Sequence, residues 1–223
     1  VYNNYDNACY IGNSTNPYVI LVQANNYAGL IETCVVNGNT KFLNTNCFSA
    51  ETKLKSITLP DGLISIGSYS FYRCGTLGAV TIPDSVTSIG VNAFEKCSAL
   101  SLITIPDSVE SIGAYAFEGC SALSSIIIPN GVESITDYAF QGCSALSSII
   151  IPDSVTDMHA TFRFSNALTN VPKLSNNVTT LSNAFESCYN LKRINSDTDG
   201  LINIPNVTSL GNRVFYSCAQ ITN

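Results

Sequence analysis

The sequence is poor in the residues that most kinds of functional site need. Its 223 residues include no tryptophan, one histidine and one methionine, and only 12% of them are charged. The 10 lysines and arginines are scattered, which argues against nucleic-acid binding, because neutralising phosphates requires clustered positive charge. No apolar run reaches the roughly eighteen residues that a membrane-spanning helix needs. A Cys-x-x-Cys pair, the usual sign of a structural zinc site, is also missing.

What the chain has in quantity is apolar residues. A hydrophobic content of 45% with a formal net charge of −6 describes a folded protein with a large core. The nine cysteines are an odd number and too few for a disulfide scaffold. Because the chain begins at Val1 without a methionine, we expect it to be a processed or trimmed piece of a longer protein.

The dominant feature is an internal repeat. The stretch "SIGAYAFEGCSALSSIIIP" at 111–129 returns almost unchanged as "SITDYAFQGCSALSSIIIP" at 134–152. A phenylalanine marks each copy, at a nearly constant spacing before a longer final step: Phe48, Phe71, Phe94, Phe117, Phe140, Phe162, Phe185 and Phe215. A unit this short cannot bury its own apolar face, so the repeat predicts a solenoid whose copies stack on one another.

Each copy combines a strand pattern with a less regular segment. "LSSIIIP" predicts a short strand that ends at the proline, and an Asp-Ser, Asp-Gly or Asn-Gly turn follows it. "VTSIGVNAFEKC" at 86–97 predicts a return path with Val86, Ile89, Phe94 and Cys97 directed inward. Stacked strands lie about 4.8 Å apart, so we expect a parallel sheet along one side of the coil.

The repeated pattern Ile-Pro-Asp-Ser-Val-x-x-Ile-Gly-x-x-Ala-Phe-x-x-Cys-x-x-Leu-x-x-Ile resembles the BspA-type leucine-rich repeats, also called the Treponema pallidum type. The resemblance covers roughly residues 31–223. It implies a curved leucine-rich-repeat solenoid with a parallel β-sheet on one face and irregular or short-helical return segments. It also implies a non-catalytic module of a secreted or surface-anchored protein, with a role in adhesion to host proteins or other cells. The family has no known catalytic residues to carry over.

We predict one continuous domain with a cap at its start. "CYIGNSTNPYVILVQ" is typical of a hairpin, so residues 1–30 are expected to cap the first coil, and about eight repeats of 22–30 residues fill 31–223. Cys34 is expected to replace a strand isoleucine in the first coil. The array should be most regular over 48–152 and least regular over 158–205, where copies lose a glycine and gain the insertion "NSDTDGLIN". "AQITN" ends where a strand should begin, so no C-terminal cap is expected in this chain.

The cysteines follow the repeat. Four of them recur with its period: Cys74, Cys97, Cys120 and Cys143. Side chains stacked in register point the same way, which makes a disulfide torsion difficult, so we interpret them as buried free thiols that fill space. Glu51 and Ser165 hold the same position in two other copies. Whether Cys9 pairs with Cys34 or Cys47 stays open.

Catalytic and metal-binding patterns are weak. His159 is the only histidine, and no partner for it is indicated, so we predict no enzyme activity. A column of polar residues follows the strand-ending prolines: Asp61, Asp84, Asp107, Asn130 and Asp153. It either attracts Ca²⁺ or forms turns, and we favour turns because Asn130 interrupts the charge. Asp197 and Asp199 lie in "SDTDG", which lacks the distal Glu of a calcium loop. No metal or cofactor is predicted.

Three Asn-x-Ser/Thr sequons occur, at Asn13, Asn177 and Asn206. They matter only in a protein from a eukaryote.

The candidate binding surface is the outward side of the predicted sheet. Alternation directs two columns outward: Thr58, Thr81, Thr104, Ile127 and Ile150 in one, and Ser56, Ala79, Leu102, Ser125 and Ser148 in the other. These residues form a strip of low charge that suits contact with a protein or glycan, although threonine and isoleucine also favour strands for their own sake. The proposed partner is a host or neighbouring-cell surface. A ladder of Tyr69, Tyr115 and Tyr138 on the return path offers the alternative of a carbohydrate- or cell-wall-associated module, and a passive spacer is a third possibility.

Overall fold

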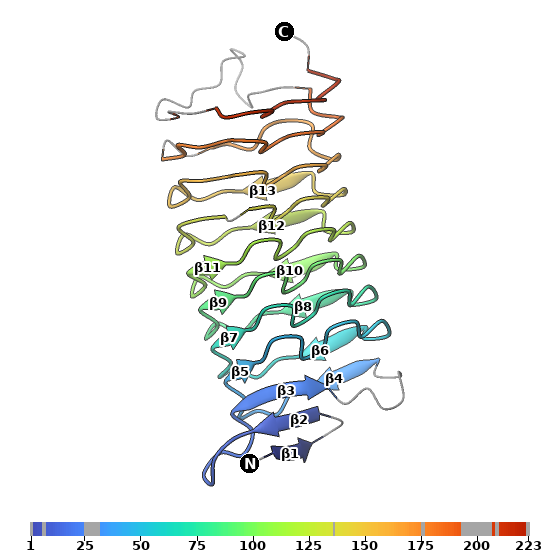
Figure 1. The fold of residues 1–223 in the computed structure, drawn as a ribbon, viewed down its shortest axis with the longest axis vertical. Helices are drawn as coiled ribbons and strands as arrows, with labels where there is room; N and C mark the ends of the chain where they lie inside the picture. Colours follow the sequence, from blue (N-terminus) through green and yellow to red (C-terminus); the bar gives the residue numbers. More distant parts are fainter. Residues whose placement is uncertain are drawn as a thin grey trace.

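The computed structural model is a solenoid in which successive coils stack along one axis (Figure 1). It describes residues 2–5, 8–24, 32–135, 137–174, 177–192, 207 and 210–221. Strands and turns make up the described part of the chain, which contains no helix. The predicted fold class, a repeat solenoid with parallel strands on one face, is therefore confirmed, and its described return segments are irregular turns. No helix in those ranges has the length and apolar character needed to cross a bilayer.

The predicted sheet is built from three-residue strands, one from each of successive coils. They are β4 (Thr33–Val35), β6 (Ser56–Thr58), β8 (Ala79–Thr81), β10 (Leu102–Thr104), β12 (Ser125–Ile127) and β13 (Ser148–Ile150). Strands β4, β6, β8 and β10 form one parallel sheet, and β12 pairs with β13 in another. Cys34 pairs in register with Ile57, as predicted for a cysteine in the place of a strand isoleucine. We call the outward side of these six strands the strand face.

A second sheet, which the sequence analysis missed, runs along another side of the coil. Its strands are β1 (Tyr2–Tyr5), β2 (Ala8–Ile11), β3 (Ile20–Ala24), β5 (Phe42–Leu43), β7 (Ser65–Ile66), β9 (Ser88–Ile89) and β11 (Ser111–Ile112). The predicted hairpin is present, because β2 and β3 pair antiparallel. Strand β3 then pairs in parallel with β5, so the hairpin extends this second sheet and not the strand face. The division at residue 30 stays a prediction.

The corner between the two sheets is a turn at each strand-ending proline. The backbone N–H of Val86 donates to the carbonyl of Pro83 over 3.0 Å, and Val109 donates to Pro106 in the same way over 3.0 Å. Serine hydroxyls join three of the corners to the coil before them, as when Ser108 Oγ donates to the Val86 carbonyl. The turn prediction for this corner is confirmed.

The return path is organised around the repeated phenylalanine. Residues two positions before and two positions after each of the eight phenylalanines have positive φ, for example Asn92 at 55° and Lys96 at 60° around Phe94. The N–H of Phe94 donates to the Ala116 carbonyl of the next coil over 2.8 Å. The backbone here therefore alternates between tight turns and hydrogen bonds directed along the solenoid axis.

The core consists of columns of equivalent residues, one from each coil. The phenylalanine rings stack from Phe48 to Phe215 with centroids 5.0 to 6.0 Å apart and interplanar angles of at most 19°. The strand residues Ile57, Val80 and Ile103 are buried beside them. Burial of aromatic rings in every coil makes each coil's stability depend on its two neighbours.

Regular strand pairing stops after β13 in the described ranges. Beyond it an isolated bridge joins Asp157 to Thr180, while the phenylalanine column continues. This agrees with the prediction that the array is most regular over 48–152. The predicted insertion lies outside the described residues.

Candidate binding surface

The strand face presents the residues that alternation directs outward. In β6, β8, β10, β12 and β13 the central residue is buried and the two flanking residues are exposed, while in β4 the central Cys34 is half-buried. Both predicted columns are accordingly on the surface: Thr58, Thr81, Thr104, Ile127 and Ile150, and Ser56, Ala79, Leu102, Ser125 and Ser148. Their orientation is confirmed, whereas their role in binding stays a proposal.

Large aliphatic side chains interrupt this small-residue surface on three consecutive coils. Leu102 is 63% exposed, Ile127 is 65% exposed and Ile150 is 58% exposed. Ile127 and Ile150 are register partners in β12 and β13, so their side chains lie about 4.8 Å apart along the axis. Leu102 lies on the preceding strand, β10. Burying these groups against a partner is favourable, because each exposes apolar area to water in the free protein.

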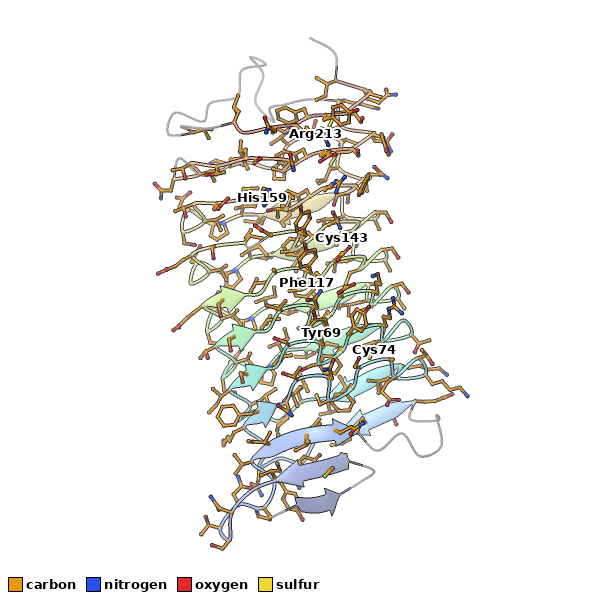
Figure 2. The ribbon with its side chains drawn as sticks, viewed as in Figure 1. Tyr69, Cys74, Phe117, Cys143, His159 and Arg213 are labelled. Atoms are coloured by element: carbon orange, nitrogen blue, oxygen red, sulfur yellow. The ribbon has the colours of Figure 1, made fainter. Side chains whose placement is uncertain are left out.

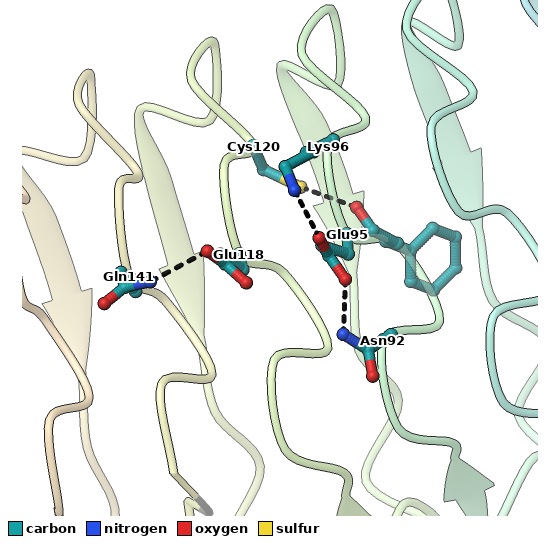
Figure 3. Close-up of polar contacts among 7 residues, drawn as sticks. Asn92, Glu95, Lys96, Glu118, Cys120 and Gln141 are labelled. Carbon is teal, nitrogen blue, oxygen red and sulfur yellow. Dashed lines mark hydrogen bonds and ion pairs between the residues drawn. The ribbon is translucent and has the colours of Figure 1, made fainter. Parts of the chain in front are cut away.

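The cysteine column has a structural role that explains why the same position recurs from coil to coil. None of the nine cysteines, all of which lie in the described ranges, forms a disulfide, so Cys9 is not bridged to Cys34 or Cys47. Each ladder thiol donates to the carbonyl of the phenylalanine one coil earlier, as Cys120 Sγ does to Phe94 O over 3.2 Å (Figure 3). Ser165 makes the equivalent bond, to Phe140 O over 3.0 Å. In these copies the position therefore holds a small donor, which the space-filling interpretation missed, and Glu51 in the first copy is an exception.

Burial keeps these thiols protonated. It raises the pKa of Cys143 from the ordinary 9.0 to about 12, and does the same for Cys74. Burial also raises the pKa of Cys97 and Cys120 well above the ordinary value. Because the thiolate is the nucleophile, these cysteines are unreactive in the folded protein.

Polar side chains decorate the return path beside the phenylalanine column (Figure 3). The buried carboxylate of Glu95 accepts from Asn92 and from Lys96 Nζ, the latter over 2.7 Å. One coil further on, Gln141 Nε2 donates to Glu118 Oε1 over 2.8 Å. These contacts use the Glu95 carboxylate and the Gln141 amide nitrogen within the array, whereas Gln141 Oε1 is buried without a hydrogen-bond partner among the described residues.

The tyrosine ladder is only partly continuous. Tyr115 and Tyr138 stack with centroids 4.8 Å apart and an interplanar angle of 11°. Tyr69 instead contacts Tyr72 edge-on at 5.6 Å, because Asn92 holds the ladder position in the coil between Tyr69 and Tyr115. Rings stacked along the axis cover one another's faces. A sugar ring packs against an aromatic face, so the stack is a poor platform for it.

The histidine has partners that the sequence did not indicate. His159 Nδ1 lies 3.0 Å from Asp137 Oδ1, and its ring contacts Tyr138 edge-on at 5.7 Å. Its side chain is 33% exposed, which agrees with a partly solvated place on the return path. Asp137 and His159 hold the same position relative to the core phenylalanines of their copies, so aligning the copies would have placed the two side chains on adjacent coils.

The structure describes the aspartate column and two of the three sequons, those of Asn13 and Asn177. Within the described ranges, no three His, Cys, Asp or Glu side chains are placed to share a metal ion. Asn13 is exposed, and its Oδ1 accepts from the backbone and hydroxyl of Thr15. Asn177 Nδ2 instead donates to the Asp153 carbonyl over 2.7 Å. Asp197, Asp199 and Asn206 lie outside the described residues.

Comparison with known families gives one extended match. The family model described as the BspA type leucine rich repeat region, with six copies, matches residues 25–121 and 92–222. Leucine-rich repeats generally form non-enzymatic scaffolds that bind proteins. No curated protein gives a significant match.

Three solved structures show the same fold. A leucine-rich repeat protein from Bacteroides ovatus is 28% identical over 86% of this chain and 50% of its own, with a TM-score of 0.71. One from Eubacterium ventriosum is 22% identical over 100% of this chain and 50% of its own, with a TM-score of 0.67. The T. pallidum leucine-rich repeat protein is 24% identical over 77% of this chain and 82% of its own, with a TM-score of 0.56. The chain thus spans about half the length of the first two.

Proposed function

Because the chain belongs to the BspA-type leucine-rich repeat family, we propose that it is a non-catalytic protein-binding module that engages its partner through the strand face. Its place is outside the cell, on a surface-anchored or secreted protein, and its role is adhesion to a host protein or a neighbouring cell. The single observation that carries the binding site is the group of exposed aliphatic side chains of Leu102, Ile127 and Ile150.

The physical argument is that this surface is inexpensive to bury and already ordered. The strand face offers hydroxyl, methyl and aliphatic groups, so a partner displaces water from few charged groups there. Strands fixed in register on a stacked core lose little conformational freedom on binding. Extended sheets of this kind are the surfaces that solenoid proteins use for recognition.

A binding screen with matched variants tests the proposal. The purified chain is applied to immobilised extracellular-matrix proteins, cell-surface proteins and glycans, beside an Ile127→Asp/Ile150→Asp variant. We expect wild-type binding to at least one protein and a loss of roughly a hundredfold or more in the variant, because both charges would be buried unpaired.

The control is an Ile64→Asp/Val91→Asp variant, which adds the same charges at exposed aliphatic positions away from the strand face. It should bind as the wild type does, and circular dichroism should show all three proteins folded. Normal binding by the Ile127→Asp/Ile150→Asp variant would place the site elsewhere.

The alternative of a carbohydrate- or cell-wall-associated module rests on the tyrosine ladder. The stacked geometry of Tyr115 and Tyr138 does not favour it, since only ring edges face outward from such a stack. Glycan binding that is lost when both tyrosines are changed to alanine would revive it. Silence towards every protein and glycan in the screen would instead support a passive spacer.

A further inference from the structure

The strand face is bordered on one side by carboxylates. Strands β6, β8, β10, β12 and β13 each run into a buried aliphatic residue, a buried proline, and then an exposed residue at the corner: Asp61, Asp84, Asp107, Asn130 and Asp153. None of the ion pairs between described residues includes any of these four aspartates. The corner is therefore a line of negative charge without a counter-charge of its own.

The turn geometry does not require the charge. At the coil of Asn130, Val132 N donates to Pro129 O over 3.1 Å, and at the coil of Asp107 the equivalent bond from Val109 measures 3.0 Å. The amide thus forms the same turn as the carboxylate. Carboxylates on consecutive coils lie about 4.8 Å apart and repel one another, so the run of Asp61, Asp84 and Asp107 costs energy that asparagine would avoid. A cationic group on a partner would compensate the charge of this row.

The opposite border of the strand face is uncharged over the same coils. The serines before each strand use their hydroxyls inside the array, as when Ser98 Oγ donates to Gly75 O and Ser121 Oγ donates to Ser98 O. The ion pair of Lys55 with Glu32 lies near the start of the array, at β6 and β4. Around Leu102, Ile127 and Ile150 the face therefore has an acidic border on one side only.

Lys41 Nζ lies beside Gly62, next to Asp61 at the start of the row, but no ion pair of the described residues involves Asp107 or Asp153. Lys96 and Arg163 belong to the return path, where they pair with Glu95 at 2.7 Å and with Glu186 at 3.3 Å. Arg213 lies 3.9 Å from the same Glu186.

Building on the proposed function, we propose that the partner is a protein segment that combines apolar side chains with a row of lysines or arginines. The apolar side chains cover Leu102, Ile127 and Ile150, and the cationic row lies along Asp107 and Asp153. Opposite charge on one border alone fixes the direction in which the segment lies across the strands and speeds encounter. The low-charge centre supplies most of the affinity through burial of apolar area.

Selection from a random dodecapeptide phage library on the immobilised 223-residue chain tests this inference. We expect the enriched peptides to contain more aliphatic or aromatic residues and more lysine and arginine than the library. Synthetic copies of the enriched peptides are then titrated against the wild type and two variants. In Asp107→Asn/Asp153→Asn the turns are preserved, since Asn130 already occupies this position. The matched control, Glu110→Gln/Glu133→Gln, removes two exposed carboxylates from the neighbouring side.

The affinity of the peptides should fall about fivefold in the aspartate variant, stay unchanged in the glutamate variant, and decrease as salt is raised. Enriched peptides without extra lysine or arginine, or peptides indifferent to the aspartate variant, would overturn the inference. If those peptides still fail to bind the Ile127→Asp/Ile150→Asp variant, the proposed function stands without the inference about charge. Peptides that bind the Asp107→Asn/Asp153→Asn and Ile127→Asp/Ile150→Asp variants as tightly as the wild type would contradict both proposals. A library that yields no enriched peptide would contradict the inference.

Discussion

At the scale of single residues, the sequence predicted which side chains are buried better than it predicted what they do there. The regular period of the repeat placed the phenylalanines and cysteines in columns, because burial in a solenoid repeats with the chain. It did not show that Cys120 is a hydrogen-bond donor, although Ser165 in the same column was a usable signal. Nor did it show the positive φ of Tyr115 and Lys96, since neither residue type favours that conformation.

The buried thiols make the stability of the protein depend on alkaline pH. In the unfolded chain Cys143 ionises near 9.0, whereas in the folded protein burial raises its pKa to about 12. The stabilising effect of the neutral buried thiol is therefore fully present below pH 9.0 and is lost as pH rises towards 12. Between about pH 8 and pH 10 this thiol alone lowers the free energy of unfolding by about 1.4 kcal/mol.

Urea unfolding under reducing conditions at the two pH values measures this loss. A Cys143→Ser variant keeps the donor to the Phe117 carbonyl but lacks the titrating thiol. Its free energy of unfolding should fall by about 1.4 kcal/mol less than that of the wild type over the same pH interval. Equal losses in the two proteins would show that Cys143 does not titrate in the way that its burial implies.

At the scale of elements, the strand face was predicted and the second sheet was not. Three-residue strands with an apolar centre give a visible alternation, whereas β7, β9 and β11 are two residues long and have too little pattern to detect. The glycine that follows each of these short strands was visible in the repeat, and its role becomes clear only from the stacking. The second sheet stops pairing regularly after β11, at the copy where Thr136 replaces that glycine in the sequence.

Gly90 shows why a side chain is not tolerated at this position. A Cβ built on Gly90 would lie 2.5 Å from the backbone N of Ser68 and 2.7 Å from the carbonyl carbon of Gly67, both in the preceding coil. Neither backbone atom can move without separating the coils, so Gly90→Ala should lower the free energy of unfolding by about 2 kcal/mol or more.

Gly78→Ala is the matched control, because a Cβ there meets no atom within 4 Å. Chemical denaturation should show this variant unchanged or stabilised by less than about 1 kcal/mol. Similar losses in the two variants would mean that backbone entropy, and not the close approach of coils, decides the effect.

At the scale of the whole molecule, the family resemblance gave the architecture, while the partner depends on a few exposed side chains. Ile127 and Ile150 were visible as a departure from the threonine column. The corner aspartates have no ion-pair partner among the described residues. This is a property of several stacked coils, so a single copy of the repeat does not reveal it. Contacts between coils also decide how the molecule unfolds, because each coil is stabilised only by its neighbours.

We therefore expect the array to unfold first in its last described coils, which lack paired strands. The chain has no tryptophan, so Tyr72→Trp and Tyr216→Trp each introduce a single fluorescent probe. The two tyrosines hold equivalent places, one position after a core phenylalanine and beneath an arginine, Arg73 or Arg213. The probe at 216 should report a lower urea midpoint than the probe at 72, and superimposable curves would show instead that the solenoid unfolds as one unit.

The coils, with their side chains, stack along the long axis of the molecule (Figure 2). Backbone hydrogen bonds join each coil to the next, so they run along this axis, and this has a mechanical consequence. Tension applied between two distant points of the chain loads one interface at a time, so coils detach singly and the force does not rise above what one interface bears. Each released coil lengthens the chain by roughly 70 Å, the reach of its residues when extended. A force–extension trace with steps of that length would identify the solenoid as an extensible tether, which yields under a brief pull and rewinds when the load is removed.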